Sequence, residues 1–356
     1  MKKIFSLTST VFILFVLFVC LSTSLTIKAQ AIACTQLKVT TLPYDYGNFG
    51  RFAVTRQSIQ HPNGNVPAPV SVFLPSNATA ENRLPVVFFA HGFGGFQYQV
   101  YEGLLQQLAS NGYIVVFAPY TPNILTTNAD RYEQMWTGFQ LAVQQYGSVM
   151  DTTKIGFAGH SYGGGALPEL TRRALAVGWG ANKLFLFAMA PWYVWGSNDY
   201  SSIPSTAKLV VQIYWDDGTN DHLIAQNDVW NRLPQITERK WQVIRTARTF
   251  CALNAGHGTP VTGNFTDADG GGITNAQDYW GVWRRIHALA DYTFNNNVAA
   301  KDIAFGTDGR MGRWRTGARH VTPLEATDSP VVNTQQTARF RWSDRCIYAD
   351  FGTPCR

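Results

Sequence analysis

Charged residues are scarce in this chain of 356 residues, since Asp, Glu, Lys and Arg together make up only 15% of it. Hydrophobic residues account for 46%, and the sequence contains neither internal repeats nor low-complexity linkers. So low a charge content excludes an intrinsically disordered chain. The composition instead indicates a folded protein, with length for one large domain or two small ones.

A strong excess of positive charge is also lacking. The formal net charge is +6, but Lys2, Lys3 and Lys28 lie within the first 31 residues, which contain no Asp or Glu. Without those residues 26 Lys and Arg stand against 23 Asp and Glu, a net charge of +3. So small an excess gives no reason to expect a nucleic-acid partner.

The longest apolar run is too short for a comfortable membrane span. "VFILFVLFVCL" follows the basic start "MKK" and precedes the small residues of "KAQA", whereas a spanning helix needs about 20 apolar residues. Residues 1–31 are therefore predicted to be a cleavable signal peptide, which implies a secreted or periplasmic protein with no stable membrane anchor. A retained anchor is the alternative. A lipoprotein acylated at Cys34 is disfavoured because "AIAC" lacks the usual preceding leucine.

Cysteine is sparse, and cleavage would leave four: Cys34, Cys251, Cys346 and Cys355. Four cysteines in an exported chain indicate two disulfides, with three possible connectivities. Cys346 and Cys355 enclose a short loop and are paired first, which leaves Cys34 with Cys251. No CxxC pair or histidine cluster has metal-site spacing, so neither a metal nor another cofactor is expected.

Short apolar segments alternate with helical ones along most of the chain. Expected strands include "PVVFFAHG", "YIVVFAP", "KIGFAGHS", "KLFLFAMAP", "KLVVQIYW" and "WQVIRTARTF" (241–250), after an antiparallel pair at "RFAVTRQSIQ" and "PVSVFLP". Expected helices include 98–111, 129–147, 163–177 and 276–295. This alternation predicts a mostly parallel, doubly wound α/β sheet with helices on both faces. We assign it to residues 32–300. Residues 301–356, rich in Gly, Arg and Thr, form an irregular or β-rich extension packed on or following that domain.

Residues 156–165, "GFAGHSYGGG", place Ser161 in a Gly-x-Ser-x-Gly motif. The motif lies between the expected strand "KIGFA" and the expected helix "GGALPELTRRAL". In that setting it is typical of a nucleophile elbow, a strained turn that exposes the serine at the carboxyl end of the sheet. Ser161 is therefore the candidate nucleophile, in preference to a purely structural glycine turn.

A serine nucleophile needs a base, and the base needs an orienting carboxylate; in this arrangement both follow the serine in the chain. His257 lies on the Gly-flanked loop "CALNAGHGTP" after the last expected strand and is the preferred base. His320 in the extension is its competitor. The loop "DDGTNDHLIA" offers three acids, Asp216, Asp217 and Asp221. We favour Asp221, which follows the Gly218 turn, although it could instead serve as a helix N-cap.

Acyl transfer also needs backbone N–H donors for the developing oxyanion. Tyr162, which follows the serine, supplies one, and Phe93 in "FFAHGFGGF" is the expected second. A phosphate-binding loop is the rival interpretation of "HGFGG", but no Gly-Lys-Ser/Thr follows it.

The stretch "PVVFFAHGFGGFQYQVYEGLLQQLASNGYIVVFAPY", taken with "KIGFAGHSYGGG", resembles α/β-hydrolases of the chlorophyllase, dienelactone hydrolase and cutinase-like polyesterase group. The resemblance covers Asn48 to Asn297. It implies that the acid lies in a Gly-x-x-Asp turn, here Gly218 to Asp221, and that Trp192 of Pro191-Trp192 walls the acyl pocket. The sequence departs from the polyesterases in having Tyr162 after the serine, and the extension has no counterpart in the group.

The segment between the strands at 183–191 and 208–215 is too short for a large cap domain, so an open groove is expected. Its expected walls are aromatic: Phe93, Tyr162, Trp192, Tyr193 and Trp195. Such a groove suits lipid-like or polyester substrates. The sequence thus predicts a secreted, monomeric serine esterase acting on small or polymeric carboxylic esters. An acyltransferase or amidase with the same triad, or a non-catalytic binding module on this fold, are the alternatives.

Overall fold

The computed structural model describes residues 40–249, 252–262, 274–315 and 319–350. The predicted signal peptide lies outside the described residues, as do Cys34, Cys251 and Cys355 of the predicted disulfides. Within the described ranges, no helix combines the length and apolar character needed to cross a membrane.

Nine strands of the described chain form a single mixed sheet in the order β1-β2-β4-β3-β5-β6-β7-β8-β9. The strands are β1 (Val54–Ile59), β2 (Val70–Pro75), β3 (Leu84–Ala90), β4 (Ile114–Phe117), β5 (Met150–His160), β6 (Lys183–Met189), β7 (Lys208–Tyr214), β8 (Glu238–Ile244) and β9 (Glu325–Thr327). The six from β3 to β8 run parallel, while β1, β2 and β9 add antiparallel pairings at the two edges. The predicted α/β fold with its antiparallel first pair is confirmed.

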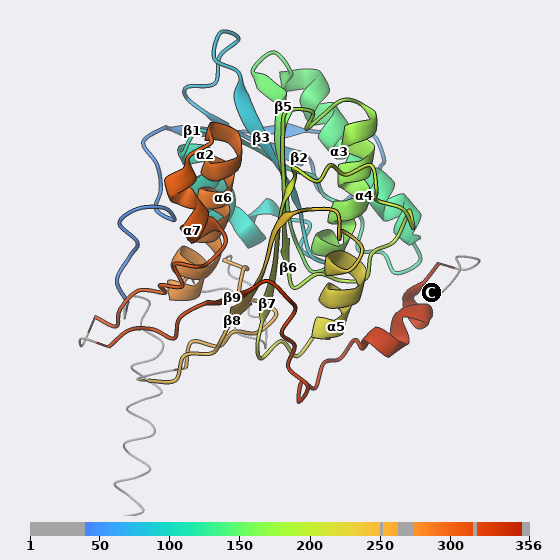
Figure 1. Cartoon of the computed structure of the whole chain (residues 1–356). Coiled ribbons are helices and arrows are strands. Elements are labelled where there is room, and N and C mark those ends of the chain that lie inside the picture. The colour runs from blue at the N-terminus through green and yellow to red at the C-terminus, as the bar shows by residue number, and fades with distance from the viewer. Residues whose placement is uncertain (1–39, 250–251, 263–273, 316–318, 351–356) are drawn as a thin grey trace, which may run out of the picture.

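Helices cover both faces of the sheet, which Figure 1 shows nearly edge-on. One face carries α2 (Glu102–Ser110), α6 (Arg284–Asn295) and α7 (Lys301–Ala304), and the other carries α3 (Asn128–Tyr146), α4 (Tyr162–Ala176) and α5 (His222–Ile224). The turn of 3-10 helix Tyr98–Tyr101 precedes α2, and a π-helical stretch Gln277–Trp283 precedes α6. A further π-helical stretch, Ala225–Trp230, continues α5. The predicted helices thus lie within a few residues of the observed ones.

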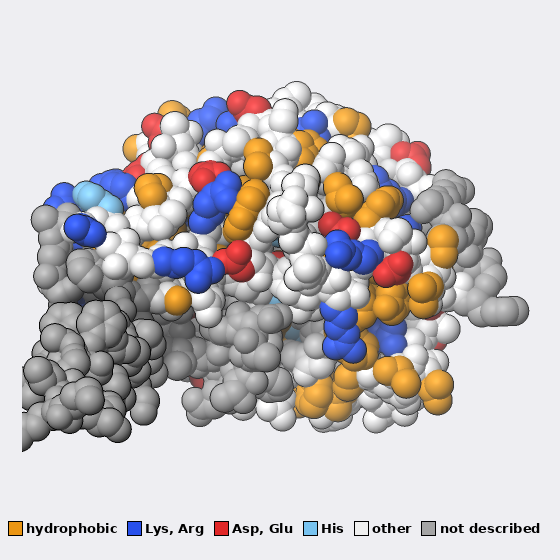
Figure 2. All heavy atoms as spheres, turned by 90° about the horizontal axis from the view of Figure 1, so that it is seen from below, with side chains coloured by type: hydrophobic (Ala, Val, Ile, Leu, Met, Phe, Trp, Pro, Cys, Tyr) orange, Lys and Arg blue, Asp and Glu red, His pale blue; other side chains and the backbone are white. Residues whose placement is uncertain are grey.

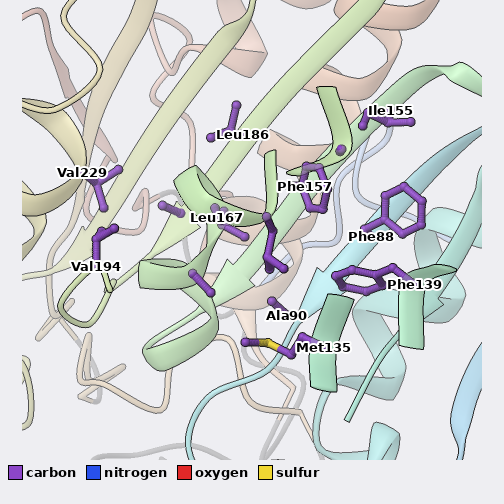
Figure 3. Close-up of a cluster of buried hydrophobic side chains, with 14 of the residues drawn as sticks. Phe88, Ala90, Met135, Phe139, Ile155, Phe157, Leu167, Leu186, Val194 and Val229 are labelled. Carbon is purple, nitrogen blue, oxygen red and sulfur yellow. The ribbon is translucent and has the colours of Figure 1, made fainter. Parts of the chain in front are cut away.

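The continuous apolar strands are buried because helices pack on both sides of them. Figure 3 shows one of the two cores, where Phe88 of β3 and Phe157 of β5 meet Phe139 of α3. The Phe88 and Phe157 rings stack at 5.3 Å between centroids, and the Phe88 and Phe139 rings lie 4.9 Å apart. β8 starts at Glu238 and ends at Ile244, so the predicted strand at 241–250 began too late and ran too far.

The chain after Lys301 returns to the sheet and to both helical layers. β9 pairs with β8, and the 3-10 helix η5 (Trp342–Tyr348) leads to Asp350, whose carboxylate accepts from the Asn128 amide at 2.8 Å. Asp350 thereby receives N–H groups that the first turn of α3 leaves unpaired. Cys346, in this segment, is disulfide-bonded.

Helix α4 approaches the end of β3 closely at Gly163. A Cβ built on this residue would lie 2.1 Å from the Ala90 carbonyl oxygen and 2.6 Å from that of His91. Both neighbours are backbone atoms, so no side-chain rotation can relieve the contact. Glycine is required here to let the helix begin directly against the strand.

Gly163→Ala is therefore expected to lower the free energy of unfolding by about 3 kcal/mol or to prevent folding, because overpacking against backbone forces the helix away from the sheet. Thermal unfolding followed by circular dichroism measures this. Gly64→Ala is the control, since a Cβ there meets nothing within 4 Å. Equal melting temperatures for the two variants would contradict the packing argument.

Candidate active site

Ser161 lies at the junction of β5 and α4. Its backbone, with φ 53° and ψ −120°, has a conformation that residues other than glycine rarely adopt. Its backbone is tied on both sides: its N–H donates to the Met189 carbonyl at 2.9 Å, and its carbonyl accepts from Gly165 at 3.0 Å and Trp192 at 2.7 Å. This is the strained strand-to-helix turn of a nucleophile elbow. It presents the hydroxyl at the carboxyl end of the sheet.

The structure brings His257 to this serine. Nε2 of His257 lies 2.9 Å from Ser161 Oγ, and Nδ1 lies 2.9 Å from Asp217 Oδ2. Because a carboxylate only accepts hydrogen bonds, Nδ1–H donates to Asp217, which leaves Nε2 to accept the serine hydroxyl. All three residues are buried, with exposed fractions of 7% for Ser161, 7% for His257 and 2% for Asp217. The arrangement is that of a Ser-His-Asp triad.

The preference for Asp221 as the acid was wrong. Asp221 is the N-cap of α5, where Oδ1 accepts from the Leu223 amide at 3.0 Å and Oδ2 accepts from the Trp342 amide at 3.1 Å. The N-cap alternative thus describes this residue. A polar side chain just before a helix satisfies amides of the first turn, which holds it at the helix end.

Asp217 takes the place next to the histidine because the chain turns directly after β7. Its Oδ1 accepts from the amides of Thr219 and Asn220 at 2.8 and 2.9 Å, so the carboxylate closes its own loop while Oδ2 faces His257. Asp216, one residue earlier, points the other way: its side chain is 41% exposed and accepts from the Thr246 hydroxyl. The sequence feature that could have identified Asp217 as the partner of His257 is its position at the end of β7.

A second histidine, His160, forms a hydrogen bond with the backbone of His257, a contact that the sequence analysis missed. His160 is buried, and burial together with the neighbouring His257 holds its pKa well below the usual range, so the ring is neutral. Its Nε2 lies 2.9 Å from the His257 carbonyl and must carry the proton; Nδ1 then accepts from the Tyr101 hydroxyl at 2.9 Å. The same hydroxyl accepts from the Gly92 amide at 3.0 Å. One chain of hydrogen bonds therefore joins the His257 loop to the loop after β3.

The loop after β3 is fixed internally as well. Burial lowers the pKa of His91 to about 3, so this ring is also neutral. Its Nε2 accepts from the Tyr120 amide at 3.1 Å, and its Nδ1–H donates to the Gly92 carbonyl at 2.7 Å. The Phe93 amide follows this anchored glycine. The Tyr162 amide begins α4, where the first turn has no intrahelical acceptor for it. Both predicted oxyanion donors thus lie on segments fixed next to Ser161.

The predicted groove walls divide into two groups. Phe93 is 49% exposed, so its ring is accessible. Trp192 is only partly exposed, and its ring packs against Phe340 and Tyr348 of the chain near the C-terminus. Tyr162, Tyr193 and Trp195 are buried, with at most 5% of each exposed. The prediction that these three rings line an open groove is wrong. Tyr162 packs against Tyr120 and Tyr132, and the chain near the C-terminus covers Tyr193 and Trp195. The Tyr348 ring stacks on Tyr193 at 5.9 Å, and the Arg345 guanidinium lies 4.5 Å from the Trp195 ring centroid.

Apolar side chains project from the loops beside the site. Ile124 and Leu125, after β4, are 81% and 87% exposed. Arg131 links this loop to Phe93, since its Nη2 donates to the Asn123 carbonyl at 2.9 Å while its guanidinium lies 5.4 Å from the Phe93 ring centroid. Figure 2, which looks onto this end of the molecule, shows groups of hydrophobic side chains mainly in its right half. No Asp, Glu, Lys or Arg occurs in residues 91–101 or 118–129.

The other candidate residues lie elsewhere. His320, the competitor for the base, is exposed and pairs through its backbone with Arg313. His287 is in α6, with Nδ1 3.0 Å from the Gln107 amide nitrogen, and His222 is fixed between Tyr214 and Asn333. Among the described residues, no three His, Cys, Asp or Glu side chains form a cluster that could hold a metal ion.

Comparison with known proteins bears on the fold and on the first part of the chain. Residues 41–190 match the family model described as chlorophyllase, and this family has the α/β-hydrolase fold. A search of the curated proteins finds no significant match. The family match indicates a hydrolase of the α/β type. Residues 41–190 are thus similar to the chlorophyllase family, and the chain has the α/β-hydrolase fold.

Proposed function

We propose that this protein is a secreted serine esterase in which Ser161, His257 and Asp217 form the catalytic triad. The observation that carries the proposal is the continuous pair of hydrogen bonds, each 2.9 Å, from Ser161 Oγ through His257 to Asp217. A serine hydroxyl is a weak nucleophile unless a base takes its proton as it attacks. The proposed cleavage after Ala31 and export of the chain belong to the same hypothesis.

In the first half-reaction, Ser161 Oγ attacks the ester carbonyl carbon and His257 Nε2 takes its proton. The tetrahedral intermediate collapses as the carbon–oxygen bond to the alcohol breaks, and His257 returns the proton to the departing alkoxide. Water then attacks the acyl-enzyme, again with His257 as base, and the acid leaves as Ser161 regains its proton. Asp217 stays ionised, orients the ring and stabilises the imidazolium.

The amides of Phe93 and Tyr162 are proposed to stabilise the oxyanion. Removing one such donor typically costs about 10²–10³ in kcat. Two features favour this role: the Phe93 amide follows Gly92, held on either side by Tyr101 and His91, and the Tyr162 amide starts α4. Donors that are fixed before the reaction need no reorganisation as charge develops.

The surroundings of the site favour an uncharged, apolar ester. Phe93, Ile124 and Leu125 expose large hydrophobic surfaces, and the two loops that carry them hold no charged residue. The Arg131 guanidinium lies beside these loops, but this residue is buried and donates to the Asn123 carbonyl. A long acyl or alkyl chain, as in a lipid-like ester or polyester, would be removed from water against the loops.

Ser161→Ala and His257→Ala are each expected to reduce kcat for p-nitrophenyl butyrate by about 10⁴-fold or more, because each change breaks the proton path from serine to imidazole. His320→Ala should keep most of the activity, since that side chain is exposed and outside the triad. Thermal unfolding verifies that each variant folds. A tenth of the wild-type activity left in Ser161→Ala would overturn the proposal.

Running the wild type on p-nitrophenyl esters of rising chain length, beside triglyceride, polyester film and a peptide amide, defines the substrate class.

Asp217→Asn is expected to lower kcat by about 10⁴-fold, because an amide nitrogen facing Nδ1 favours the wrong imidazole tautomer while keeping the side-chain shape. Asp221→Asn is the matched control. It should remain active, because asparagine can keep the helix cap through its oxygen. The Trp342 amide loses its acceptor, so the free energy of unfolding should fall by about 1 kcal/mol. Asp216→Asn should also have a small effect, since that carboxylate faces away. An inactive Asp221→Asn beside an active Asp217→Asn would contradict this assignment of the acid.

A further inference from the structure

The acid lies on a loop that the chain near the C-terminus holds in place. Residues 333–342, here termed the C-terminal clasp, run along residues 215–222, the acid loop between β7 and α5. In Figure 1 the red C-terminal chain passes below the sheet, near α5 and β7. More than a hundred residues of sequence separate the two segments. No local sequence pattern therefore predicts the contacts between them.

Gln336 makes the central contacts between the two segments. It is 7% exposed, and its side-chain nitrogen donates to the carbonyls of Asp217 at 2.7 Å and Asn220 at 2.6 Å. Its side-chain oxygen accepts from the His222 amide at 3.0 Å. A single amide group thus satisfies three backbone groups of the acid loop. One of them belongs to the residue whose carboxylate faces His257.

Backbone pairing extends the contact along the loop. The amides of Arg339 and Phe340 each donate at 2.9 Å, to the carbonyls of Gly218 and Thr219 respectively. The Asp221 amide donates in return to the Phe340 carbonyl at 3.0 Å. At the other end, Asn333 Nδ2 donates to the Trp215 carbonyl at 3.1 Å. The acid loop is therefore bound to the clasp from its first residue to the start of α5.

The loop's own hydrogen bonds close the turn but do not fix its outer side. The Asp217 carboxylate accepts the Thr219 and Asn220 amides, so any displacement of that backbone displaces the carboxylate. The outward carbonyls of residues 215 and 217–220 are the ones that the clasp satisfies. Buried carbonyls without partners would destabilise this loop conformation.

We propose that the C-terminal clasp positions the catalytic acid and that Gln336 is its principal positioning residue. The inference rests on the triad proposed above, in which Asp217 orients His257. The hydrogen bonds of the Gln336 side chain described above all join it to the acid loop, so it acts through that loop. A misplacement of about 1 Å in a catalytic group can cost about 10²-fold in rate. The extension thus contributes to the active site without entering it.

Gln336→Leu tests this, since leucine has a similar volume but can neither donate to nor accept from the loop. We expect kcat for p-nitrophenyl butyrate to fall about 10- to 100-fold, with KM changed less than about twofold. The control is Gln235→Leu. The Gln235 side-chain nitrogen also bridges two loop carbonyls, those of Tyr200 and Ile203, away from the triad. This control should keep wild-type kcat.

A double-mutant cycle separates positioning from general destabilisation. If Gln336 acts through Asp217, adding Gln336→Leu to Asp217→Asn should cost less than about threefold further, because the acid's contribution is already lost. Full additivity, or an unchanged kcat in Gln336→Leu, would overturn the proposal. If Gln336→Leu does not fold, Asn333→Ala is put through the same cycle with the same criteria. An active Asp217→Asn would instead show that the triad proposal has failed.

Discussion

The backbone strain at Ser161 is the constraint on which the site depends. A non-glycine residue at φ 53° and ψ −120° costs about 1–3 kcal/mol, and it persists only when its surroundings impose it. Here β6 accepts the serine amide through Met189, while Gly165 and Trp192 donate to its carbonyl. Gly163 lets α4 start against the end of β3. Removing any of these supports would let the turn relax and withdraw the hydroxyl from His257.

Once the serine is fixed, the other segments have to meet it. Hydrogen bonds from His160 through Tyr101 to Gly92 connect the His257 loop with the loop after β3. All these groups are buried, so a missing partner would leave an unsatisfied polar atom in an apolar setting. Burial keeps the His160 ring neutral, so one ring nitrogen must donate and the other must accept. Each hydrogen bond of this network therefore has a fixed donor and a fixed acceptor. The network therefore favours a single arrangement of the two loops.

Much of this was predictable from the sequence. The parallel strands were recognisable because strands buried on both faces are continuously apolar, and Ser161 because its motif lies between a strand and a helix. His257 was recognisable because its Gly-flanked loop follows the last expected strand. The fold prediction is confirmed, and the structure places the His257 ring next to the Ser161 hydroxyl.

What the sequence could not supply were contacts between distant segments. Asp217 and Asp221 are four residues apart and chemically identical, and only the start of α5 decides which becomes a cap. Tyr193 and Trp195 were expected in the groove because nothing local reveals that Tyr348 and Arg345 cover them. Such errors follow from long-range packing, which has no periodicity to detect.

The family match ends at residue 190, after Ser161 and before Asp217 and His257, the proposed acid and base. The matched part builds the nucleophile elbow and the loop after β3, and the remaining chain must bring Asp217 and His257 to it. It does so with β7 and β8, whose parallel pairing places both loops at one edge, and with the chain near the C-terminus, which binds the outer side of the acid loop. A segment that pairs with β8, caps α3 and holds the Asp217 loop cannot be removed without altering the site. The extension is thus a structural part of the proposed catalytic unit.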